Sequence, residues 1–153
     1  MSGKIDKRLE ELGITLPEIG KLPGNFVPSK RVGNLLYVSG QVPIKDGQIV
    51  SGIVGQDVSV EEAKDLARYT ALFALAAAKK SIPSLDSIRQ VVKVNGWVNA
   101  EPGFGQQPAV INGASDLLVE VLGEKGRHAR AAIGIATLPG NAPVEVEVIF
   151  EVE

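Results

Sequence analysis

Residues 130–152 read RAAIGIATLPGNAPVEVEVIFEV, and this stretch decides the fold. Its second half, Val144 to Val152, alternates apolar and polar side chains from Val144 to Val148, as a strand does when one face is buried. Its first half, Arg130 to Thr137, predicts another strand, and Leu138 to Pro143 predicts the turn between the two. Val144, Val146 and Val148 then share the core face, and Glu145 and Glu147 share the other.

Two helices are predicted upstream of this strand pair. Ser59 and Glu62 form a capping box that opens a helix running to about Lys80. Residues 107–122 carry apolar side chains at helical spacing and predict a second helix. Between them, residues 88–98 predict a strand with Val92 and Val94 on one face. These elements predict an α+β fold, with both helices on one face of a mixed sheet.

The other sheet face, which carries Glu145 and Glu147, would have no helix over it. Domains of this type commonly cover such a face by forming an oligomer. Residues 1–153 are expected to form a single domain with an N-terminal extension over residues 1–22. The extension begins with a short helix over Lys4–Leu12, and the segment after it, residues 14–28, is expected to lie extended on the domain.

Composition excludes several classes of function. The 153 residues contain no cysteine and one histidine, His128, which leaves no thiol nucleophile and no multi-histidine metal site. The net charge of −2 disfavours a general nucleic-acid binder. The charged N-terminal residues do not resemble a signal peptide, and no apolar run reaches the length of a membrane span. The expected location is the cytoplasm.

Arg130 is the strongest candidate for ligand binding. It lies at the start of an otherwise apolar strand, and a guanidinium fork suits a carboxylate. The alternative is an ion pair with Glu145 or Glu147 on a neighbouring strand. Glu145 and Glu147 repel each other, so one of them is a candidate base for activating water, and the alternative is a solvated polar surface.

Other positions give weaker indications of a binding site. Ser39 follows a buried strand but has no base in a known triad spacing, and Gly40 would allow close approach of a ligand to the backbone. Asn112 lies on or beside the apolar face of the second helix, and Phe26 is of a type most often found in a core. No glycine-rich phosphate loop is present in the sequence.

Two strings together resemble the Rid family, also called the YjgF family. They are PGNFVPSKRVGNLLYVSGQVPI at residues 23–44 and ARAAIGIATLPGNAPVEVEVIFEV at residues 129–152, and the resemblance covers residues 23–152. It implies a chorismate-mutase-like fold and a homotrimer with clefts between subunits. It also implies hydrolysis of 2-imino acids and their enamine tautomers to 2-oxo acids and ammonia, without a cofactor.

The resemblance also implies roles for individual residues. Arg130 matches the arginine that holds the substrate carboxylate, and Glu145 matches the carboxylate that positions water. Ser39 and Gly40 match residues that line the cleft, and Asn112 matches a helix asparagine near it. Phe26 takes the place of a tyrosine at the cleft mouth, and Ala132 stands where many members have a cysteine, so both are expected to contribute to substrate binding.

The resemblance therefore implies an imine deaminase that needs no cofactor, and the retained Arg130 and Glu145 fit a site for a small carboxylate. The replacements at Phe26 and Ala132 keep open a non-catalytic protein that binds small carboxylates or 2-oxo acids. Ribonuclease activity, which the family label endoribonuclease L-PSP suggests, has little support from an acidic chain with one histidine.

Overall fold

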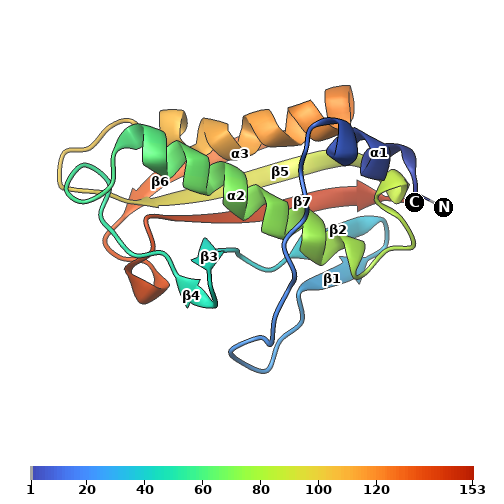
Figure 1. The fold of residues 1–153 in the computed structure, drawn as a ribbon, viewed down its shortest axis with the longest axis horizontal. Helices are drawn as coiled ribbons and strands as arrows, with labels where there is room; N and C mark the ends of the chain where they lie inside the picture. The colour runs from blue at the N-terminus through green and yellow to red at the C-terminus, as the bar shows by residue number, and fades with distance from the viewer. Residues whose placement is uncertain (1) are drawn as a thin grey trace.

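A computed structural model describes residues 2–153 of the chain. Figure 1 shows two long helices lying across a sheet, with the N-terminal segment running down the front of the molecule. The helices and strands, in chain order, are α1 (Lys4–Glu11), β1 (Ser29–Val32), β2 (Leu35–Val38), β3 (Ile44–Lys45), β4 (Gln48–Ile49), α2 (Val60–Lys79), β5 (Ile88–Asn99), α3 (Gln107–Leu122), β6 (Ala129–Ile135) and β7 (Val144–Val152). Short 3-10 turns occur at Leu85–Ser87, Gly123–Gly126 and Pro139–Asn141.

The main sheet has the strand order β1-β2-β7-β5-β6. Strands β5 and β6 are parallel, and the other neighbours are antiparallel. The mixed sheet predicted from the sequence is therefore confirmed. The order also separates β6 from β7, which follow each other in the chain, because β5 lies between them.

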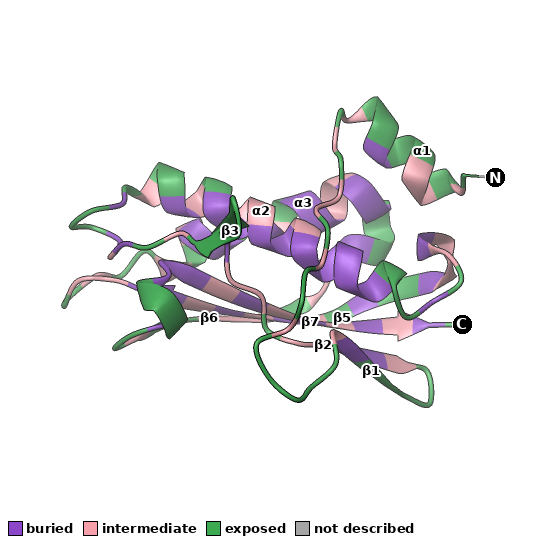
Figure 2. Ribbon diagram, turned by 60° about the horizontal axis from the view of Figure 1, so that its bottom comes forward, coloured by how far each residue is buried: buried purple, intermediate pink, exposed green. Residues whose placement is uncertain are grey.

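Helices α2 and α3 cover one face of this sheet, as predicted, and Figure 2 shows the buried residues between the two layers. The capping box of α2 is present, since Ser59 Oγ accepts from the Glu62 amide at 3.1 Å and the Glu62 carboxylate accepts from the Ser59 amide at 3.0 Å. Alanines on the inner side of α2 are fully buried. Gly113 of α3 lies so close to the Lys64 carbonyl of α2 that a Cβ atom there would collide with it. Small residues thus bring the two helices into close contact.

One prediction about strand β5 is wrong. Val94 is fully buried, but Val92 is 36% exposed, and Val91 occupies the core instead. The pairing of β5 with β7 shifts register between Val91 and Lys93. Such an irregularity inserts an extra residue into the alternation, so that Val92 and Val94 do not share a face.

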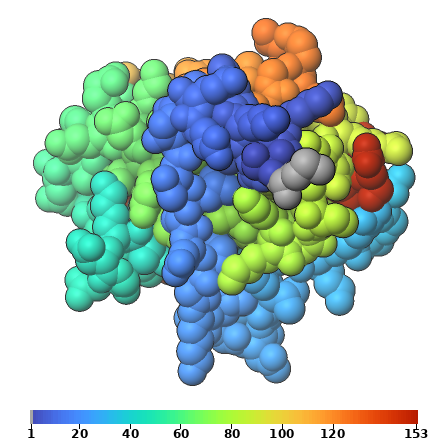
Figure 3. All heavy atoms as spheres, turned by 45° about the vertical axis from the view of Figure 1, so that its right-hand side comes forward, coloured from blue at the N-terminus to red at the C-terminus, as the bar shows by residue number. Residues whose placement is uncertain are grey.

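The N-terminal extension packs onto the domain. Helix α1 is followed by residues 14–28, which we call the strap. Figure 3 shows the N-terminal segment as a ridge across this side of the molecule. Leu16 and Ile19 of the strap pack against the core. This arrangement agrees with the expectation that the segment lies on the domain.

The two-stranded β3–β4 sheet is a separate hairpin near α2 (Figure 1). The Tyr69 hydroxyl of α2 donates to the Ile44 carbonyl at 2.9 Å and attaches the hairpin to the helix. Ile44 and Ile49 are cross-strand partners in this hairpin.

Candidate functional site

Glu145 and Glu147 lie on the face of β7 opposite the helices. Their neighbours Val144, Val146 and Val148 are fully buried on the other face, which confirms the predicted alternation.

The two glutamates have different surroundings. The Glu147 carboxylate accepts a hydrogen bond from the Asn95 side chain at 3.0 Å. No side chain or amide of residues 2–153 donates to the Glu145 carboxylate. Partial burial, and then the negative charge of Glu147, raise the pKa of Glu145. Glu145 therefore combines a raised pKa with a carboxylate that no donor of residues 2–153 binds.

Gly40 lies directly against Glu145. A Cβ atom at position 40 would be 2.7 Å from a Glu145 carboxylate oxygen, so a larger residue there would displace that carboxylate. The backbone reaches this position through reciprocal hydrogen bonds between Gln41 and Val146, at 2.8 and 2.9 Å. The Ser39 hydroxyl is already engaged, because it donates to the Val27 carbonyl at 2.7 Å.

Glu145, Gly40 and Phe26 line one open groove of about 760 Å³, which we call the Glu145 groove. Phe26 is 49% exposed, so it is not the core residue that its type favours. We call these three residues the Glu145 half-site.

Arg130 lies on the helix-covered face at the sheet edge, in contact with α3. Its Nη1 atom donates to Asn112 Oδ1 at 2.7 Å and to Ser115 Oγ at 3.2 Å. Within residues 2–153 these hydrogen bonds use only Nη1, so the Nε and Nη2 donors remain for a ligand. Ala132 follows on the same face of β6, two residues along. Asn112, Ser115, Arg130 and Ala132 form the Arg130 half-site.

His128 supports this half-site from behind. Its Nδ1 atom is 2.6 Å from the Gly126 carbonyl, and its Nε2 atom is 2.9 Å from Ser115 Oγ. Burial first, and then the positive charge of Arg130, lower the pKa of His128, so the ring is neutral at pH 7. A carbonyl only accepts, so Nδ1 carries the proton and Nε2 accepts from the Ser115 hydroxyl. The Ser115 oxygen is then free to accept from Arg130.

The two half-sites do not meet within one chain. Arg130 pairs with Val94 of β5, and β5 in turn pairs Trp97 with Glu145 of β7. Strand β5 therefore separates the two residues, and their side chains lie on opposite faces of the sheet. The idea that one neighbouring strand brings Arg130 beside Glu145 or Glu147 is wrong. Across residues 2–153, the ion pairs do not include Arg130.

The described residues show neither a metal site nor a membrane-spanning helix. Residues 2–153 contain no group of three or more His, Asp or Glu side chains arranged to hold a metal ion. In the same range, no helix is both long and apolar enough to cross a bilayer.

The fold and these half-sites define a class of protein. A family model described as "YjgF/chorismate mutase-like, putative endoribonuclease" matches residues 6–152, and the chain belongs to this family. Its α+β fold is thus chorismate-mutase-like, with a mixed sheet and two main helices packed on it.

Individual relatives are similar over most of their length. The chain is 41% identical to Protein TCP17 of Trypanosoma cruzi, covering 98% of this chain and 95% of that protein. It is 51% identical to Atu1372 of Agrobacterium tumefaciens, a crystal structure of a protein of unknown function, with a TM-score of 0.87 and coverage of 97% and 91%. It is 29% identical to a 2-iminobutanoate/2-iminopropanoate deaminase of Dermatophagoides farinae, covering 85% of this chain and 88% of that protein.

Sequence reasoning missed Ser115 and gave His128 no place in the site. A signal was present, since Asn112 and Ser115 are three apart on a helix, and His128 and Arg130 are two apart at a strand. Each pair shares a face. No comparable sequence pattern indicated that the strap lines the Glu145 groove.

Proposed function

We propose that the protein hydrolyses 2-imino acids and their 2-enamino tautomers to 2-oxo acids and ammonia. The observation that carries this proposal is the complementarity of the two half-sites. One holds an oriented guanidinium with free donors, and the other holds a basic carboxylate with no hydrogen-bond donor within residues 2–153. A relative named as a 2-iminobutanoate/2-iminopropanoate deaminase supports the same chemistry.

Arg130 binds the substrate carboxylate in this proposal. Its Nε and Nη2 donors lie side by side on the guanidinium and can engage both oxygens of one carboxylate. Asn112 and Ser115 fix Nη1, so little side-chain freedom remains to be lost when the substrate binds. The site thus orients the C=N carbon without a metal or an organic cofactor.

Glu145 positions and deprotonates water. The water oxygen forms a bond to the imine carbon while Glu145 accepts a water proton, and Glu145 returns this proton to the imine nitrogen to give a carbinolamine. Glu145 then accepts the carbinolamine hydroxyl proton and passes it to the nitrogen as the C–N bond breaks, so the C=O bond forms and ammonia leaves. A raised pKa makes the Glu145 carboxylate a stronger base near neutrality.

A complete site needs two copies of the chain, because one chain keeps Arg130 and Glu145 apart. We therefore propose a homotrimer in which the Arg130 half-site of one copy meets the Glu145 half-site of the next. A closed ring of three such head-to-tail contacts would give three equal sites. The face without helices also exposes large apolar side chains, Tyr37 at 44% and Ile133 at 49%, which an assembly would cover.

The direct test is ammonia release from 2-iminobutanoate that is generated in situ. Wild type should accelerate release over the spontaneous rate, and Arg130→Ala should lower kcat/KM by about 100-fold because the substrate is no longer oriented. Absence of any acceleration by wild type would contradict the proposal.

A second candidate is a non-catalytic protein that binds small carboxylates or 2-oxo acids. Phe26 favours it, because this exposed ring brings no hydroxyl to the groove. Ala132 likewise offers no polar side chain beside Arg130. Calorimetric titration with 2-oxobutanoate separates the two functions, since tight binding without turnover supports the second.

A further inference from the structure

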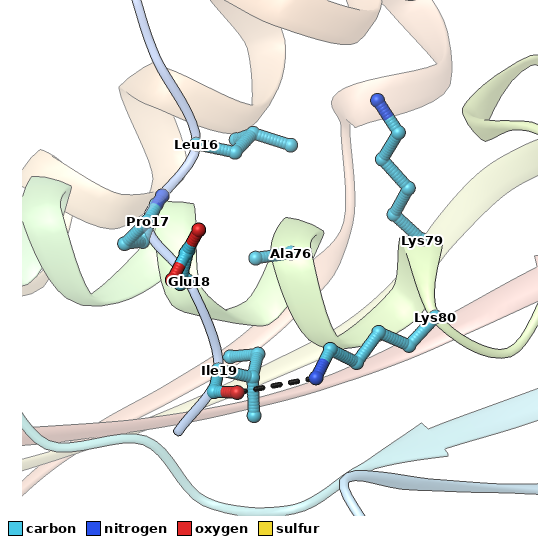
Figure 4. Close-up of a pocket in the computed structure, with 7 residues that line it drawn as sticks. All are labelled: Leu16, Pro17, Glu18, Ile19, Ala76, Lys79 and Lys80. Atoms are coloured by element: carbon cyan, nitrogen blue, oxygen red, sulfur yellow. Dashed lines mark hydrogen bonds between the residues drawn. The ribbon is translucent and has the colours of Figure 1, made fainter.

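Hydrogen bonds attach both α1 and the strap that follows it to the domain. Before it, the Lys4 and Ile5 amides of α1 donate to the Asp86 carboxylate at 2.8 and 2.9 Å. Along it, Lys80 Nζ of α2 donates to the Ile19 carbonyl at 3.1 Å, as Figure 4 shows. The same close-up shows Ala76 of α2 facing the strap, which leaves the chain room to lie near the helix. The strap therefore lies against α2 and forms part of the surface of the domain.

Residues 17–23 of the strap line the Glu145 groove. The other walls come from the β3–β4 hairpin, through Ile44 and Ile49, and from α2, through Phe73. Glu145 and the N-terminal extension thus border the same cavity.

The walls of this groove are mostly apolar. Residues 2–153 expose eight large hydrophobic side chains, and three of them, Phe26, Ile44 and Ile49, line the groove. Leu22 and Ile19 of the strap add to the same walls, while Glu18 and Lys21 supply charges. Exposed apolar side chains gathered in a concavity mark a place where an apolar group binds.

We propose that the Glu145 groove receives the substrate side chain, and that the substrates are 2-imino acids with large apolar side chains, branched or aromatic. This inference rests on the proposed deaminase function. A cavity of about 760 Å³ falls in the range that suits ligands far larger than 2-iminopropanoate, whose side chain is one methyl group. Such a small side chain would leave the apolar walls in contact with water.

The test compares imines of different size. An L-amino-acid oxidase, with oxygen and catalase, generates 2-imino acids from alanine, leucine or phenylalanine, and semicarbazide traps the imine that remains. Loss of trapped imine gives the relative kcat/KM of the protein for each substrate. Wild type should favour the leucine or phenylalanine imine over the alanine imine by about tenfold or more, as expected for several buried methylene groups.

Variants of the groove test whether its apolar walls cause the preference for large substrates. Leu22→Ala combined with Ile49→Ala should bring the ratio to within about threefold, because the apolar walls recede from the side chain. Val32→Ala, an equally apolar change at a side chain 63% exposed on β1 and outside the groove, should leave the ratio unchanged. A wild-type ratio near one, or a ratio that the double variant does not alter, overturns the inference.

Binding of the products distinguishes failure of this inference from failure of the proposed function. If no imine is hydrolysed faster, calorimetry with 4-methyl-2-oxopentanoate and 2-oxopropanoate still measures the preference. Tighter binding of the larger acid by about tenfold, lost in the double variant, supports the groove even without catalysis. Equal affinities, no binding of either acid, or a neighbouring copy of the chain filling the groove in the assembled protein overturns the inference.

Discussion

The Arg130 half-site and the Glu145 half-site differ in how firmly they are held. Arg130 donates to Asn112 and Ser115, and Ser115 is itself held by a neutral His128. Glu145 lies at an open groove, beside a like charge and against a glycine. Side-chain hydrogen bonds therefore hold the Arg130 guanidinium, whereas the Glu145 carboxylate is positioned only by its backbone.

In the proposed function, this difference corresponds to two tasks, which are binding the substrate and accepting a proton. A group that only binds gains from being fixed in advance, because less freedom is lost with the ligand. A group that accepts a proton gains from a raised pKa, and hydrogen-bond donors would lower it again. The two neighbouring glutamates differ in their contacts, since the Glu147 carboxylate accepts from the Asn95 side chain and the Glu145 carboxylate has no donor within residues 2–153.

The largest expected effect comes from mixing variants of the two half-sites. Arg130→Ala and Glu145→Gln should each lower kcat/KM by about 100-fold when assayed alone. Co-expression in equal amounts should recover about one quarter of wild-type activity, because a quarter of the intersubunit sites would combine an intact Arg130 with an intact Glu145. Ammonia release from 2-iminobutanoate measures the recovery.

The control for this mixture is each variant co-expressed with a tagged copy of itself, which should stay inactive. A mixture no more active than its components would contradict a site shared between copies.

A smaller effect is expected behind Arg130. Ser115→Ala removes one acceptor of the guanidinium and should raise KM by about tenfold, as for loss of a hydrogen bond to a charged group. The value of kcat should change little, since in the proposed mechanism Arg130 binds the substrate and does not transfer the proton. Ser115→Thr keeps a hydroxyl and should restore KM.

The matched control is Ser87→Ala, a serine of the Leu85–Ser87 turn that lies outside both half-sites. It should leave both constants within about twofold. Equal changes in kcat and KM for Ser115→Ala would argue for a general structural role.

The smallest effect is on stability. Because the pKa of Glu145 is raised by folding, ionisation of this group opposes the folded state at pH 7. Glu145→Gln should therefore raise Tm by about 2 °C at pH 7. At about pH 3, below the ordinary pKa of a glutamate, the carboxyl of wild type is largely protonated in both states, and the difference in Tm should shrink as the pH falls to that value.

Calorimetry of both proteins across this pH range measures the effect. Glu10→Gln, an exposed glutamate of α1, is the matched control and should show no such gain. An equal difference in Tm at both pH values would contradict the assigned cause.

The sequence predicted those features that depend on local pattern. The alternation in β7, the capping box of α2 and the helical spacing in α3 each depend on residues close in the chain, and all three are confirmed. The register shift in β5 was not predictable, because it depends on how β5 pairs with β7.

The same reason explains why the candidate site was predicted only in part. Adjacent strands in the chain suggested that Arg130 and Glu145 lie together, yet the sheet inserts β5 between them. The contact of Arg130 with Asn112 joins a strand to a helix that precedes it, and only the folded chain brings them together. The family resemblance supplied the roles that local pattern left open.

The way the strap is held has a consequence for engineering and for divergence among relatives. Asp86 binds backbone amides of α1, just before the strap, and Lys80 binds the Ile19 carbonyl within it. Any residue can supply such a carbonyl, and any residue except proline can supply such an amide. Side chains at residues 20–23 can then be exchanged without weakening these attachments. A new set of side chains there would change the shape and polarity of the cavity beside Glu145 while the backbone keeps its position.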